Sequence, residues 1–137
     1  MGTTRAPLPR LDEADTGPFW RATAEHRLTF QVCDGCERVV FYPRRHCPSC
    51  GGLETTWNDS LGHGTLYTFT IVRQHSMPFF ADRVPYVLGV IDLDEGFRIT
   101  SEIVTDDLDS VAIGSRLRVR WEDHADVAVP LFAVEQP

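Results

Sequence analysis

The chain contains no lysine, so all thirteen of its cationic side chains are arginines, and twenty acidic residues give it a formal net charge of −7. This balance makes a polyanion a poor partner, because nucleic-acid binding depends on clustered positive charge. No apolar run approaches the roughly 20 residues that cross a bilayer, and residues 1–10 lack the apolar core of a secretory signal. We therefore expect a soluble, cytoplasmic protein with no membrane segment.

The common local signatures of an independent active site are also missing. The sequence has no HExxH motif, no nucleophile elbow and no glycine-rich phosphate loop. Three acids cluster at Asp92, Asp94 and Glu95, but they fall in a predicted turn, where acidic residues are common. We assign no catalytic residue to the chain alone, and leave open that one of its side chains completes the active site of a partner.

Cysteine is scarce and confined to one segment. The four cysteines form two CxxC pairs, Cys33/Cys36 and Cys47/Cys50, with ten residues between the pairs. In a reducing compartment this repeated spacing indicates a metal site. Four thiolates complete the tetrahedral shell that zinc prefers, at sulfur–metal distances of about 2.3 Å, and leave no open position. We predict a structural zinc, with Gly35, Gly51 and Gly52 allowing the tight turns of the two loops.

Other roles for the cysteines remain as alternatives. Iron is one, because four thiolates also bind a single iron and CPSCG is similar to a rubredoxin loop. Two disulfides would close strained small loops. A thioredoxin-like redox pair is disfavoured because a strand-like run, residues 39–42, follows the first pair. A catalytic metal would need a position for water, which arises here only if His46 replaces a neighbouring cysteine.

The remaining sequence predicts a mainly β protein. Residues 1–14 show no periodicity and predict a mobile or partner-dependent tail. A helix follows from a cap at Asp15 or Thr16 to about His26, with Phe19 and Trp20 as core or interface anchors. Residues 53–61 predict a linker strand. The strands expected after it cover 64–72, 86–93, 97–104, 116–121 and 131–134, with a short helical turn at 106–113.

Five short strands with a small helical element between the third and fourth are the layout of an OB-fold barrel. We predict an N-terminal tail and helix at 1–30, a zinc ribbon at 31–55, and the barrel at 56–137. The aromatic residues Tyr67, Phe69 and Trp121 alternate along barrel strands and are expected in the core.

The order of these motifs resembles the DUF35 family of OB-fold proteins with a rubredoxin-like zinc ribbon. The resemblance rests on the four cysteines with CPSCGG, on GHGTLYTFTIV and on VPYVLGVIDLDEG, and it covers about residues 17–134. It implies an accessory subunit in a hetero-oligomer with a thiolase-like (SCP2-type) enzyme, such as a steroid side-chain acyl-CoA aldolase or acyltransferase, or a role beside MaoC-like hydratases. Acyl-CoA is the implied ligand.

The loop between the first two barrel strands carries four consecutive apolar residues, Met77 to Phe80, which is unusual for a loop left in water. We predict that Met77, Phe79 and Phe80 dock on the partner together with Phe19 and Trp20. The candidate contacts for CoA phosphates are Arg44, Arg45, Arg73 and His75. The alternatives are a free-standing acyl-CoA-binding module and a single-stranded nucleic-acid-binding protein. Six arginines against thirteen acids in residues 56–137 disfavour the latter.

Overall fold

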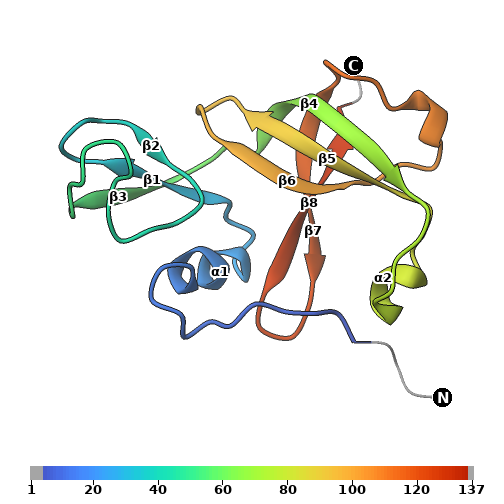
Figure 1. The fold of residues 1–137 in the computed structure, drawn as a ribbon, viewed down its shortest axis with the longest axis horizontal. Helices are drawn as coiled ribbons and strands as arrows, with labels where there is room; N and C mark the ends of the chain where they lie inside the picture. Colours follow the sequence, from blue (N-terminus) through green and yellow to red (C-terminus); the bar gives the residue numbers. More distant parts are fainter. Residues whose placement is uncertain (1–4, 136–137) are drawn as a thin grey trace.

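The computed structural model describes residues 5–135, and the predictions for residues 1–4 and 136–137 lie outside this range. Within it, two sheets lie side by side, with a short helix beneath the junction between them (Figure 1). The elements are α1 (Gly17–Thr23), β1 (Thr29–Cys33), β2 (Val39–Val40), β3 (Thr55–Asp59), β4 (His63–Val72), α2 (Pro78–Ala81), β5 (Tyr86–Leu93), β6 (Arg98–Ile103), the 3₁₀ turn η1 (Leu108–Ser110), β7 (Arg116–Asp123) and β8 (Ala128–Val134).

The smaller sheet has the order β2-β1-β3 and carries the cysteine loops. All five residues of β3 pair with β1, from Cys33↔Thr55 to Thr29↔Asp59. The strand predicted within 53–61 is therefore present, but it is part of the ribbon sheet and not a linker between ribbon and barrel. The side chains of β3 alternate only weakly between apolar and polar. The sequence pattern therefore gave no indication that β3 pairs with β1, which lies more than twenty residues earlier in the chain.

The larger sheet is a closed barrel with the order β4-β5-β6-β8-β7, which confirms the predicted five-stranded OB-fold. All its neighbouring strands are antiparallel except β6 and β8, which touch in parallel at Ile103↔Phe132. Alternate residues of the strands fill the interior, because successive side chains of a strand point to opposite faces. The fully buried set includes Leu66, Val87, Ile91, Ile103, Leu117 and Phe132.

A ladder of aromatic rings joins the small sheet to the barrel. Phe30 of β1 stacks on Phe97 at 5.0 Å between ring centroids, and Phe41 lies 4.8 Å from the same ring. Phe19 of α1 meets Phe41 at 5.8 Å. Thr23 ties the helix to the barrel, because its hydroxyl donates to the carbonyl of Trp20 and accepts from the amide of Ala128. Ribbon, helix and barrel therefore share one hydrophobic core, although the predicted domain boundaries remain a prediction.

Local corrections concern the two helices and one strand. The first helix ends at Thr23 rather than near His26, whose φ of 57° is incompatible with a continuing right-handed helix. The apolar loop at 77–80 forms the short helix α2. A β-bulge between Leu66 and Thr68 displaces Tyr67, which was expected in the core, onto the outer surface.

Candidate metal centre and the surrounding surfaces

The four cysteine sulfurs converge at the end of the small sheet. All four Sγ atoms lie within 4.8 Å of one another, and no disulfide joins them. The nearest pairs cross between the two loops: Cys33 and Cys50 are 3.5 Å apart, and Cys36 and Cys47 are 3.6 Å apart. Four sulfurs around an ion at about 2.3 Å would be about 3.8 Å apart in a tetrahedron. The arrangement therefore fits a tetrahedral metal site.

The two CxxC loops have the same backbone design. In each, the amide of the first cysteine bonds a carbonyl five residues later, at Arg38 and at Gly52. The residue after the second cysteine has a left-handed backbone in both loops, with φ of 64° at Glu37 and 77° at Gly51. In the first loop Gly35 was expected to provide this freedom, but the left-handed residue is Glu37.

Backbone amides point at the sulfurs and favour their ionised form. The amide N–H of Cys36 lowers the pKa of Cys33, and the amide N–H of Cys50 lowers the pKa of Cys47 to about 6. For Cys36 the amide of Arg38 acts in the same direction, but burial and the neighbouring thiols outweigh it and raise the pKa to about 11. Because metals bind thiolates, this donor set is suited to a metal ion.

Burial distinguishes the four ligands. Cys33 and Cys47 are buried, Cys36 is half-buried and Cys50 is exposed. His46 is exposed and lies outside the cluster formed by the described residues, so it does not replace a cysteine there. The four cysteines form a complete protein shell, which is the arrangement of a structural metal site.

A buried glutamine connects the metal loops to the rest of the ribbon. The side-chain amide of Gln31 donates to the carbonyl of Arg44 at 2.9 Å and to the hydroxyl of Thr55 at 3.0 Å, and its oxygen accepts from the amide of Arg44 at 2.9 Å. Gln31 thus holds the inter-loop segment through its backbone. The guanidinium groups of Arg44 and Arg45 are left at the surface, where Arg45 pairs with Asp15 at 3.4 Å.

The four residues predicted to contact CoA lie in two places. Arg44 and Arg45 follow β2 in the ribbon, whereas Arg73 and His75 lie between β4 and α2. These two segments are at opposite ends of the long axis of the molecule (Figure 1). All four side chains are exposed, but the chain alone does not gather them into one phosphate site.

The residues predicted to dock on a partner also separate by burial. Phe19 is 4% exposed and belongs to the core, so it offers little surface to another protein. Trp20, Phe79 and Phe80 are half-buried, and Met77 is exposed. The ribbon adds Tyr42, which is 51% exposed and which the sequence analysis did not select. Its ring lies 4.6 Å from the ring of Phe41 in a tilted arrangement. The sequence pattern gave no sign that Tyr42 stays exposed while Phe41 packs against the core.

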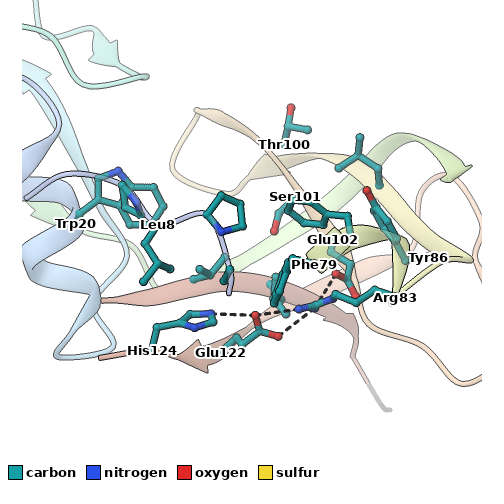
Figure 2. Close-up of a pocket in the computed structure, with 17 residues that line it drawn as sticks. Leu8, Trp20, Phe79, Arg83, Tyr86, Thr100, Ser101, Glu102, Glu122 and His124 are labelled. Carbon is teal, nitrogen blue, oxygen red and sulfur yellow. Dashed lines mark hydrogen bonds and ion pairs between the residues drawn. The ribbon is translucent and has the colours of Figure 1, made fainter. Parts of the chain in front are cut away.

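Two adjoining depressions connect these residues. One lies between the ribbon and the barrel and is lined by Phe41, Tyr42 and Pro43 together with β6. The other lies between α1 and α2 and is shown in Figure 2. Both are lined by Trp20 and Val129, so they form one continuous apolar face.

A charged cluster in the second depression was missed by the sequence analysis. Arg83 donates to Glu102 at 2.9 Å and to Glu122 at 3.1 Å, and His124 lies 3.1 Å from the same oxygen of Glu122 (Figure 2). These residues come from the α2–β5 connection, from β6 and from the end of β7. No local motif marks them, because only barrel closure brings them together.

The barrel surface has a depression in which Arg118 and Arg120 lie beside Glu135. Arg83, Arg98 and Arg116 each pair with carboxylates. Tyr67 is exposed, yet its ring is already covered on one face by the guanidinium of Arg98, 3.8 Å from the ring centroid. Two arginines beside a glutamate make a short patch in a chain of net charge −7, which gives little support to single-strand binding, because that needs cations along an extended phosphate path. In residues 5–135 no helix is long and apolar enough to span a membrane.

Comparison with protein families divides the chain at the start of the barrel. Residues 20–56 match the ChsH2 rubredoxin-like zinc ribbon domain, and residues 57–122 match the ChsH2 C-terminal OB-fold domain. A DUF35 domain-containing scaffold protein of Methanothermobacter thermautotrophicus is 34% identical over 109 residues, which cover 77% of this chain and 80% of the relative.

A second relative is longer than this chain. It is a probable enoyl-CoA hydratase alpha subunit of Thermomonospora curvata, 27% identical over 96% of this chain but only 40% of its own length. Among solved structures, the Ltp2-ChsH2(DUF35) aldolase superposes with a TM-score of 0.81 at 25% identity, covering 89% of this chain and 95% of that one. The fold thus occurs in a known structure, and the ribbon that carries the four cysteines matches a zinc-ribbon family.

Proposed function

The chain belongs to the DUF35 family of proteins with a rubredoxin-like zinc ribbon and an OB-fold domain, and from this premise we propose that it is the accessory subunit of a thiolase-like enzyme. The observation that carries the proposal is the likeness, over nearly the whole fold, to the DUF35 chain of an Ltp2-ChsH2 aldolase. The names of the two relatives, a scaffold protein and an alpha subunit, support a role in an assembly.

The metal in this proposal is zinc, and it shapes the ribbon without taking part in chemistry. The compact cluster of four sulfurs and the ribbon family support a structural ion. Elemental analysis of freshly purified protein should find about one zinc per chain. Iron is the alternative, and it would make the protein coloured. A preparation that is folded and free of both metals would refute a structural role for the ion.

The docking surface in this proposal is the continuous apolar face formed by the ribbon, α1 and α2. Tyr42 stands exposed on it, and Trp20 lines both depressions. Aromatic residues and methionine are enriched at protein interfaces, where their large apolar area is buried on binding. The face therefore fits a stable partner better than open water.

Co-purification tests the docking surface. The chain would be expressed with a thiolase-like protein of the same genome, and the complex would be measured by size-exclusion chromatography. Replacing both Phe79 and Phe80 by alanine should weaken assembly at least tenfold while the barrel stays folded, because both rings lie outside the barrel core. Ile113→Ala is the matched control, since Ile113 is exposed but lies outside this face. Equal co-elution of all variants would exclude this surface.

The finer form of the proposal gives the chain a part in the CoA channel of a steroid side-chain acyl-CoA aldolase. One member of each candidate pair lies beside the apolar face: Arg44 follows Pro43 of the ribbon depression, and the ring of His75 lies 4.8 Å from that of Phe80. Replacing Arg44 and Arg45 by alanine should raise the KM of the assembled enzyme for a CoA thioester and leave its kcat unchanged. A change in kcat alone would contradict a role in CoA binding.

A free-standing acyl-CoA-binding module is the competing function. It predicts that the purified chain binds CoA esters by itself, which isothermal titration calorimetry would detect. The separation of the four candidate CoA contacts into two places favours the accessory role, in which the partner supplies the remaining contacts.

A further inference from the structure

The depression between α1 and α2 has the size and lining of a small-molecule site. It is a cavity of about 540 Å³, and residues 6–9 of the N-terminal segment form one of its walls. Figure 2 shows Trp20, Leu8 and Phe79 around it, with Tyr86 at the far side. The other apolar walls come from Phe80, Leu88, Val129 and Leu131. Small-molecule sites in proteins are typically apolar cavities of roughly 300–1,000 Å³ with a few placed polar groups.

The placed polar groups here are the Arg83 cluster. The side chains of Arg83 and Glu102 are 24% and 18% exposed, so both are largely withdrawn from water. The single guanidinium faces two carboxylates, those of Glu102 and Glu122. When both acids are ionised, these two carboxylates and the guanidinium together carry a net charge of about −1.

One acceptor of this cluster is unused. Glu102 accepts the Arg83 hydrogen bond through Oε1, while its Oε2 makes no hydrogen bond within residues 5–135 and is not sealed from solvent. Burial raises the pKa of Glu102, as expected for a carboxyl that lacks full hydration. At Glu122 burial also acts to raise the pKa, but the hydrogen bond from Arg83 and the contact with His124 outweigh it. Glu102 is thus the carboxyl of the cavity that still needs a donor.

We propose that this cavity binds an apolar molecule that carries one hydrogen-bond donor, a hydroxyl or an amine, and no negative charge. The apolar body lies against the aromatic walls, and the donor bonds Oε2 of Glu102. An anion is excluded because the guanidinium of Arg83, which lines the cavity, is already paired with two carboxylates. The proposal goes beyond the accessory role and concerns the chain by itself.

Three matched probes test the ligand class: 2-naphthol, 2-naphthylmethylamine and 2-naphthoate share one ring system and differ in their polar group. Binding to the metal-loaded full chain at pH 7.5 would be followed by amide chemical shifts in two-dimensional NMR. We expect the alcohol or the amine to shift the signals of Ser101, Glu102 and Trp20, and the carboxylate to bind at least tenfold more weakly. Binding of the alcohol but not the amine, or the reverse, identifies the donor.

Two variants locate the site. Glu102→Gln should weaken binding of the donor probe about fivefold to tenfold, because it replaces a charged acceptor by a neutral one. Asp92→Asn is the control, since it removes an exposed acid of the same barrel outside the cavity. Leu88→Trp leaves the charged cluster intact, fills the cavity from β5 and should abolish binding.

Three results would overturn the proposal: no binding by either donor probe, equal binding of 2-naphthoate, or unchanged affinity in both Glu102→Gln and Leu88→Trp. All three are measured on the chain without a thiolase-like partner, because the cavity is part of the proposed docking surface and a partner would cover it. A failure here is therefore distinguishable from a failure of the accessory-subunit proposal, which co-elution decides.

Discussion

Replacing Glu37 by glycine should stabilise the metal-binding ribbon. Glu37 occupies the same place in the first cysteine loop that Gly51 occupies in the second, and both have a left-handed backbone. A side chain at such a position costs energy, because its Cβ approaches the following carbonyl oxygen. The Glu37 side chain is exposed and makes no hydrogen bond among the described residues, so its removal breaks no hydrogen bond of the fold.

The expected magnitude follows from two opposing contributions. Relief of the left-handed strain is worth about 1–2 kcal/mol, and the greater freedom of glycine in the unfolded chain takes back about 0.4–1 kcal/mol. Glu37→Gly should therefore gain about 0.5–1 kcal/mol. Gly51→Ala should lose a similar amount, because a Cβ at Gly51 meets no atom within 4 Å and only the backbone strain remains.

Urea unfolding of the metal-loaded chain measures both effects. With a slope of about 1.5 kcal/mol/M, the midpoint should rise by about 0.3–0.7 M for Glu37→Gly and fall by a similar amount for Gly51→Ala. Glu37→Ala is the control, since it removes the carboxylate but keeps the Cβ. If Glu37→Ala gained as much as Glu37→Gly, or if Glu37→Gly lost stability, backbone strain would not explain the geometry of this loop.

Two further predictions concern the barrel. Gly64→Ala should destabilise the protein by about 1–3 kcal/mol, because the new Cβ would lie 2.6 Å from the carbonyl oxygen of Asp92 on β5. Thermal unfolding measures this loss. A stability equal to that of the parent would mean that β4 and β5 can move apart at this position. Burial raises the pKa of Glu102, which lies beside Arg83, Glu122 and Tyr86. Protonation of Glu102 therefore favours the folded state. This stabilisation is fully present below about pH 4.5 and is lost as the pH rises through the pKa of the folded state. The free energy of unfolding of the parent, minus that of Glu102→Gln, should therefore fall as the pH rises above about 4.5. Urea unfolding at several values across about pH 4–7 measures this difference. A difference that rises or stays constant with pH would contradict the raised pKa.

The family and the architecture could be predicted from the sequence because they depend on local motifs and on periodic patterns of apolar residues. The cysteines of each pair are three residues apart, and the turn after each pair closes within the same loop. In the barrel, Phe97, Ile99 and Ile103 alternate with polar residues as a half-buried strand requires, and all three are buried. Such patterns identify the element and its inward face before any long-range contact exists.

Three features depended on neighbours that are distant in the sequence. The strand within 53–61 was expected to link the ribbon to the barrel, but it belongs to the ribbon because it pairs with β1. Phe19 was placed inside by Phe41, which lies in the ribbon, and not by any feature of its own helix. Tyr67 faces outward because a bulge in β4 changes the alternation of the strand there.

The sequence by itself determined the composition of the metal shell, the order of the strands and the family, because these follow from residue spacing and alternation. Tertiary structure alone decided which surface residues share a site. Arg83, Glu102 and Glu122 come from three parts of the chain, and they meet only when the barrel closes. Periodicity reports the face on which a side chain lies, whereas its partner is set by the long-range packing of other strands.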